Sequence, residues 1–132
     1  MNIVIISAHP DDCEAYAGGT AVKWARTGHR VLFVSLTNGD AGHHAMGGGA
    51  LARRRLKEAA LSARRGGVEA LVLDHHDGEL MPTLAARYEV IRIIRKHMAD
   101  MVISHHPSDY HPDHRYTSTL VQDASFMVTV PN

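Results

Sequence analysis

The chain of 132 residues contains a single cysteine, Cys13, so no disulfide can form within it. One lone thiol is typical of a protein that folds in a reducing compartment. No apolar run approaches the roughly 18–20 residues that a bilayer-spanning helix needs. Residues 1–8 also lack the basic start of a signal peptide. We therefore expect a cytoplasmic protein with no membrane among its partners.

The sequence has no excess of either charge, because 14 Lys and Arg residues balance 14 Asp and Glu residues. Such a balance does not favour electrostatic capture of nucleic acid. No G-x-G-x-x-G motif follows the first apolar run, and the Gly-Lys-Ser/Thr of a P-loop is missing. We expect no nucleic-acid partner, and the common nucleotide-binding motifs do not occur.

Histidine is the residue type that the chain has in abundance, with 11 copies. It is the commonest metal ligand and a natural acid or base near neutral pH. A histidine-rich, cysteine-poor chain therefore favours metal chemistry. Seven of these histidines gather in three short stretches, namely His43-His44, His75-His76 and His105-His106 with His111.

Apolar runs typical of buried strands alternate with helical patterns along the chain. This alternation predicts one α/β domain over residues 1–132, with a mostly parallel sheet and helices on both faces, which is a Rossmann-like three-layer sandwich. The expected strands are 2–7, 29–37, 68–74 and 101–104, and the expected helices are 21–27, 50–65, 83–97 and one that starts near His114.

Two polar motifs directly follow the first and the last of these strands. The first is His9-Pro10-Asp11-Asp12 and the second is His111-Pro112-Asp113-His114. Ligands of open α/β sheets bind beyond the carboxyl ends of the strands. We therefore expect both motifs to meet at one edge of the sheet.

A catalytic zinc site needs three protein ligands and one open position, and His9, Asp12 and His114 would supply them. Asp11 and His111 would be available for proton transfer and for stabilising an oxyanion. A structural interpretation stays open: Asp11 or Asp12 could cap the next helix, and the second-motif histidines could belong to a His-Pro turn.

The stretches AHPDDCEAYAGGT and YHPDHR resemble the two signatures of the LmbE-like/PIG-L family of zinc-dependent N-acetylglucosaminyl deacetylases. The resemblance continues in the loop TNGDAG, in Arg55 and Glu58, and in Asp77-Gly78. It implies that His9, Asp12 and His114 bind the metal.

The resemblance further implies roles for residues around the metal. Asp11 would be the general base, His111 would assist as an acid or oxyanion donor, and Arg55 would bind substrate. We also expect His43 and Asp77 to border the substrate, and Asp109 to orient a catalytic histidine, as metal-bound imidazoles usually require.

The implied activity is removal of an acyl group from a small amino-sugar-like substrate with Zn²⁺, although a His₂Asp site also accepts Fe²⁺ and other divalent metals. Family domains usually continue beyond the second signature, so we expect this chain to correspond to the N-terminal, metal-binding portion. The alternative is an inactive or non-catalytic metal-binding domain. A homo-oligomer is a further expectation, because a missing tail would expose apolar surface.

Overall fold

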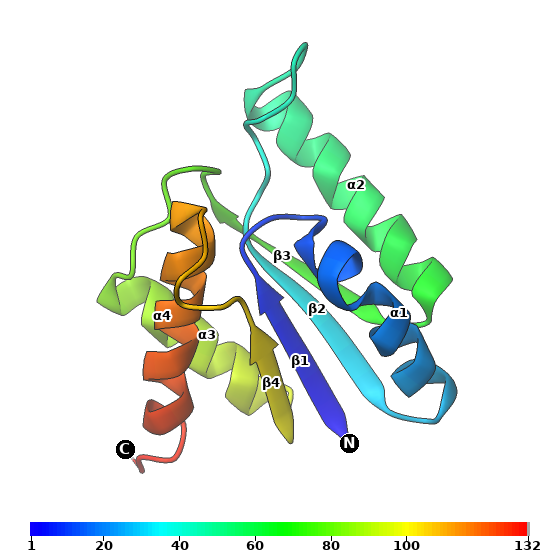
Figure 1. Ribbon diagram of the computed structural model, residues 1–132, viewed down its shortest axis with the longest axis vertical. Coiled ribbons are helices and arrows are strands. Elements are labelled where there is room, and N and C mark those ends of the chain that lie inside the picture. Colours follow the sequence, from blue (N-terminus) through cyan, green and yellow to red (C-terminus); the bar gives the residue numbers. More distant parts are fainter. Residues whose placement is uncertain (132) are drawn as a thin grey trace.

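The computed structural model describes residues 1–131. Its four strands form one sheet in the order β3-β2-β1-β4, and every neighbouring pair is parallel (Figure 1). The predicted α/β fold is confirmed. The elements in chain order are β1 (Asn2–Ser7), α1 (Asp12–Arg26), β2 (Arg30–Thr37), α2 (Gly48–Gly66), β3 (Glu69–His75), α3 (Leu84–Lys96), β4 (Met101–Ser104) and α4 (Pro112–Met127).

The helices lie in two pairs on opposite faces of the sheet, α1 with α2 and α3 with α4 (Figure 1). Alternate residues of β1 explain this arrangement, because successive side chains of a strand point to opposite faces. Ile3 and Ile5 pack in a core with Ala21 of α1, whereas Val4 and Ile6 belong to the core that includes α3 and α4. The central strand is thus buried on both faces.

Helix α1 begins at Asp12, nine residues before the expected start at Ala21. Gly18 and Gly19 suggested a break, yet both lie inside the helix. A glycine in a helix costs about 1 kcal/mol relative to alanine. The burial of Cys13 and Ala21 against the sheet offsets that cost, so packing overrides the local preference.

Helix α4 begins at Pro112, slightly before the expected start near His114. Proline suits the first position of a helix because its missing N–H would have no partner there. The His111 side chain caps this helix by accepting a hydrogen bond from the Asp113 N–H at 3.2 Å.

Because all four strands are parallel, their carboxyl ends meet at one edge of the sheet, where the loops after β1 and β4 lie side by side (Figure 1). Within residues 1–131, no helix combines the length and the apolar character that a membrane crossing requires.

Candidate metal and active site

Three side chains converge at this edge of the sheet. The Nδ1 atom of His9 lies 3.3 Å from Asp12 Oδ2 and 3.2 Å from His114 Nε2. Asp12 Oδ2 lies 3.4 Å from His114 Nε2. Two imidazole nitrogens and one carboxylate oxygen therefore form a nearly equilateral triangle.

The size of this triangle fits a divalent metal. Zinc binds nitrogen and oxygen ligands at about 2.0–2.2 Å in a tetrahedron, whose edges are then about 3.3–3.6 Å long. The three distances between the donor atoms agree with that edge without any movement of the side chains. The site has the two-nitrogen, one-oxygen composition that suits zinc and other divalent transition metals.

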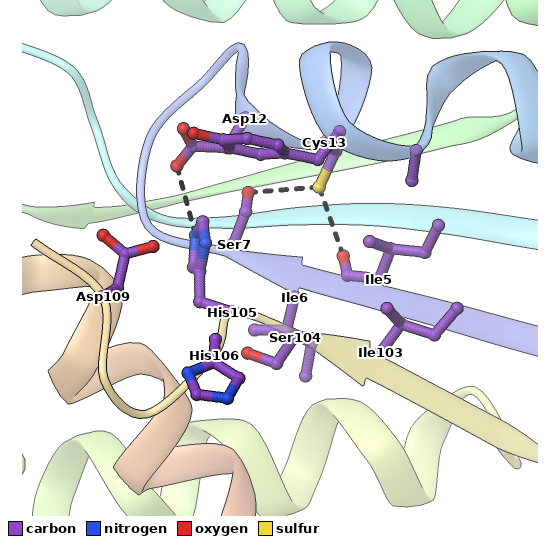
Figure 2. Close-up of a pocket in the computed structure, with 12 residues that line it drawn as sticks. Ile5, Ile6, Ser7, Asp12, Cys13, Ile103, Ser104, His105, His106 and Asp109 are labelled. Atoms are coloured by element: carbon purple, nitrogen blue, oxygen red, sulfur yellow. Dashed lines mark hydrogen bonds and ion pairs between the residues drawn. The ribbon is translucent and has the colours of Figure 1, made fainter. Parts of the chain in front are cut away.

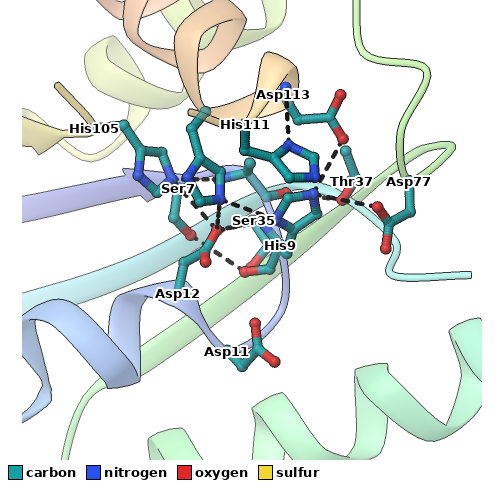
Figure 3. Close-up of polar contacts among 12 residues, drawn as sticks. Ser7, His9, Asp11, Asp12, Ser35, Thr37, Asp77, His105, His111 and Asp113 are labelled. Atoms are coloured by element: carbon teal, nitrogen blue, oxygen red, sulfur yellow. Dashed lines mark hydrogen bonds and ion pairs between the residues drawn. The ribbon is translucent and has the colours of Figure 1, made fainter. Parts of the chain in front are cut away.

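The backbone fixes the turn between β1 and α1 that carries His9 and Asp12. Thr37 on β2 donates its backbone N–H to the Ala8 carbonyl at 2.8 Å, and Ser35 Oγ donates to the His9 carbonyl at 3.1 Å. The turn is closed by the His9 N–H, which donates to Asp12 Oδ2 at 2.8 Å. Figure 3 shows Ser35 and Thr37 of β2 next to His9.

Each histidine of the triangle contacts a carboxylate through its other ring nitrogen. His9 Nε2 lies 3.1 Å from Asp113 Oδ2 and 3.2 Å from Asp77 Oδ1. His114 Nδ1 lies 3.0 Å from Asp109 Oδ1. Such carboxylates fix the orientation of metal-binding imidazoles and raise their basicity. Both rings therefore direct their remaining nitrogen into the triangle.

Asp113 is itself held rigidly, because it is fully buried and both of its carboxylate oxygens accept backbone hydrogen bonds. The Gly78 N–H donates to Oδ2 at 2.7 Å and the Leu80 N–H donates to Oδ1 at 3.3 Å. The loop after β3 is thereby joined to the first turn of α4, and His9 is held between them.

Electrostatics in the cluster depend on competition between burial and charge. Burial disfavours the protonated form of His9, but Asp12 and Asp77 outweigh it and raise the pKa of His9 to about 10. Burial likewise opposes the charged form of Asp12, yet its contacts with the side chain and backbone N–H of His9 help hold its pKa well below the ordinary value. Burial lowers the pKa of His114, which favours the neutral imidazole that a metal requires.

Asp11 lies beside the triangle rather than in it. Although it occupies the position before α1, its side chain makes no capping hydrogen bond. Asp11 Oδ2 instead lies 3.3 Å from the Arg55 guanidinium of α2, which also contacts Glu58 at 3.3 Å. In Figure 3 Asp11 stands apart from the network of contacts around His9.

A cavity of about 290 Å³ connects these groups. Its lining comprises His9, Asp11, Asp12, Ala41, Gly42, Arg55, Asp77, Tyr110, His111 and His114. The ring of His111 packs edge-on against His9, with ring centroids 4.7 Å apart. The Nδ1 atom of His111 accepts the Asp113 N–H, so in the neutral ring Nε2 carries the proton and acts as a donor.

Comparisons with known proteins agree with this geometry. The sequence profile of the PIG-L family, described as GlcNAc-PI de-N-acetylase, matches residues 4–125. The chain is also 36% identical over 136 residues to the diacetylchitobiose deacetylase of Thermococcus kodakarensis, covering 98% of this chain and 51% of that protein. The chain belongs to the PIG-L family.

Solved structures of similar proteins share the fold. The N,N'-diacetylchitobiose deacetylase from Pyrococcus horikoshii superimposes with a TM-score of 0.91 at 34% identity, over 99% of this chain and 51% of that one. A 4-carboxy-2-hydroxymuconate hydratase from Pseudomonas putida reaches the same TM-score at 23% identity, over 98% of this chain and 57% of that one. The second likeness concerns the fold alone. This PIG-L chain spans about half the length of its curated relative.

The expected residues of this PIG-L chain differ in how close they lie to the cavity. All three expected metal ligands line the cavity. Four other expected residues line it as well, namely Asp11, His111, Arg55 and Asp77. Asp77 also contacts His9, which commits part of its carboxylate to that ring. His43 is not among the lining residues; its ring stacks on that of His44, with centroids 4.5 Å apart.

Sequence reasoning missed two residues of the site. Asp113 lies between the two histidines of the second motif, and its place in the first turn of α4 puts it against His9. His105 belongs to a histidine-rich stretch of the sequence, and its position directly after β4 is the signal that could have indicated it.

Proposed function

We propose that this chain is a metal-dependent deacetylase that hydrolyses the acetamide of an N-acetylated amino sugar. One observation carries the proposal: the triangle of donor atoms in His9, Asp12 and His114 opens into a cavity that Asp11 and His111 also line. The names of the relatives support the substrate class, because both deacetylases act on diacetylchitobiose. We take residues 1–132 as one domain that carries the metal-binding portion.

His9, Asp12 and His114 would hold the cation, with zinc as the expected metal and Fe²⁺ as the other candidate. A bound divalent metal supplies a Lewis acid that makes water nucleophilic near neutral pH and polarises the amide carbonyl. Asp109 and Asp113 would keep the two imidazoles in the orientation and tautomer that metal binding requires.

Asp11 would serve as the general base. Its carboxylate accepts a proton from the attacking water while the water oxygen forms a bond to the amide carbon. The carbon–nitrogen bond then breaks, and the same proton passes to the departing nitrogen. The immediate products are acetic acid and the free amine of the sugar. The acid then loses its proton to the amine or to water, which gives acetate, so atoms and charge balance.

His111 would donate from Nε2 to the carbonyl oxygen as negative charge develops there. Its Nδ1 is already committed to the Asp113 N–H, which leaves Nε2 as the donor. Arg55 would bind substrate at the cavity wall, and its contact with Asp11 keeps that carboxylate at the edge of the cavity.

The test combines metal analysis with amine release from N-acetylglucosamine and from diacetylchitobiose. Wild type should hold about one zinc or iron per chain and release amine, and His114→Ala should lose both. Asp11→Asn should keep the metal and lose about 10²–10⁴-fold in rate, which is the usual contribution of a general base. Asp123→Asn on the exposed side of α4 is the matched control and should behave as wild type.

The outcomes separate the two interpretations. Metal binding without turnover of any amide by wild type would favour the non-catalytic domain, and Asp11→Asn would then change nothing. Absence of metal from wild type would contradict the proposed site itself. Light scattering on the same samples would test the further proposal that the chain forms a homo-oligomer.

A further inference from the structure

His105 is a buried imidazole that the proposed mechanism does not use. It directly follows β4, and only 7% of its side chain is exposed. Figure 2 shows its ring beside Asp12, at the end of a cavity of about 340 Å³ between α1 and β4. Burying a polar ring at this depth requires partners, and those partners indicate what the residue does.

The ring of His105 stacks on the ring of His114. The two centroids are 3.9 Å apart and the ring planes differ by only 4°. His114 is thus confined on one side by this parallel ring, and the Asp109 carboxylate holds its Nδ1. Rotation of the His114 imidazole about its side-chain torsions would collide with His105.

The same ring also contacts the segment that carries the other ligands. The Ala8 backbone N–H donates to His105 Nε2 at 3.0 Å, and Ala8 immediately precedes His9. Nε2 lies 3.3 Å from Asp12 Oδ2, the oxygen that forms one corner of the triangle. His105 therefore lies between the end of β1 and the first turn of α4.

His105 is unsuited to be a metal ligand, although its Nε2 and donor atoms of Asp12 and His114 lie within 4.8 Å of one another. The Nε2 lone pair is directed at the Ala8 N–H. A metal bound by Nε2 would leave that buried N–H without a hydrogen-bond partner, which is unfavourable.

We propose that His105 is a positioning residue that sets the geometry of the metal site. It does so by stacking on His114 and by fixing the backbone just before His9. This inference rests on the proposed metal site but assigns His105 no contact with substrate. Loss of residues that orient ligands typically weakens metal binding about 10–100-fold.

The experiment measures zinc affinity by competition with a chelator, the visible spectrum of the Co²⁺-loaded protein, and the thermal midpoint of the metal-free protein. His105→Ala removes both contacts. His105→Phe keeps a ring for stacking but loses the acceptor, and His105→Gln keeps an acceptor but loses the ring. His106→Ala is the matched control, because His106 is the neighbouring exposed histidine.

We expect His105→Ala to lose about 10–100-fold in zinc affinity. Because the Co²⁺ spectrum depends on the arrangement of the ligands, it should change as well. Phe and Gln should each restore part of the affinity, and His106→Ala should match wild type. Unchanged affinity and spectrum in His105→Ala would overturn the inference. A lower thermal midpoint with an unchanged Co²⁺ spectrum would also overturn it, because it would assign His105 a merely structural role.

The design separates failure of this inference from failure of the proposed function. If wild type binds no zinc, the metal site itself is wrong. If wild type binds zinc and His114→Ala does not, the site stands, and the His105 variants alone decide the positioning role.

Discussion

Substitution of Asp113 by asparagine should strongly destabilise the protein, although the two side chains have nearly the same shape. Both carboxylate oxygens face N–H donors: Oδ2 accepts from Gly78 and contacts His9, and Oδ1 accepts from Leu80. An amide offers only one oxygen. In either orientation, its NH₂ group must therefore face a buried N–H.

The less costly orientation directs the amide oxygen at Gly78, since that contact is 2.7 Å long and the contact with Leu80 is 3.3 Å long. One hydrogen bond to a charged group is then lost, which is worth about 1.5–3 kcal/mol, and a buried donor is left unsatisfied. Because the lost bond is the longer one, we expect a total loss of about 2–4 kcal/mol. This is a large share of the stability of a typical domain.

Urea denaturation of the metal-free protein measures this loss without interference from metal binding. With a slope of about 2 kcal/mol per molar, the midpoint should fall by about 1–2 M. Asp123→Asn is the matched control on the same helix. Its partner is Arg87 at 2.7 Å, with both side chains a third or more exposed, and such pairs contribute about 0–1 kcal/mol.

Equal midpoints for Asp113→Asn and Asp123→Asn would refute the reasoning. That result would mean that the loop after β3 relaxes enough to present another acceptor to the two backbone N–H groups. A loss of zinc affinity without a loss of stability would instead assign Asp113 to the orientation of His9 alone.

Three further predictions concern residues outside the metal triangle. Burial raises the pKa of the Cys13 thiol to about 12, so a thiol reagent at pH 8 should label the denatured protein rapidly and the folded protein hardly at all. Gly18→Ala and Gly19→Ala should each raise the free energy of unfolding by about 0.5–1 kcal/mol, because no surrounding atom lies within 4 Å of the added Cβ. A lower thermal midpoint of either variant in calorimetry would contradict this prediction. The contact between His76 and Asp40 raises the pKa of the histidine above its ordinary 6.5 and lowers that of the aspartate below 3.8. The stabilisation from this ion pair should therefore be fully present between those two ordinary pKa values. It should fade as the pH rises through the raised pKa of His76 and as the pH falls through the lowered pKa of Asp40. A stability difference between wild type and His76→Asn that does not depend on pH would contradict this prediction.

The gathering of the two motifs at one edge of the sheet was predictable from sequence. Short β-branched runs such as residues 2–7 indicate buried parallel strands, and parallel strands place everything that follows their ends on the same side. His9 and His114 could therefore be expected to meet, even though they are 105 positions apart. This expectation follows from the parallel arrangement of the strands alone and does not depend on how the side chains pack.

The supporting residues were not predictable in this way, because their roles depend on distances that only the packed structure determines. Asp113 could equally have been a solvent-exposed helix residue, and His105 could equally have been exposed like His106. The early start of α1 shows the same limit. Gly18 and Gly19 have a low propensity for helix, but the burial of Cys13 and Ala21 against the sheet stabilises a helix that includes both glycines.

The separation of His9 and His114 along the chain has a mechanical consequence. A cation held by both residues would act as a reversible cross-link between the end of β1 and the start of α4, closing a loop of about a hundred residues. By the chain-entropy treatment used for disulfides, closing such a loop lowers the entropy of the unfolded chain and thereby stabilises the folded state by about 4–5 kcal/mol. A protein with no disulfide would then gain a comparable constraint from one ion, and the contact between β1 and α4 would be more stable with the ion bound than without it.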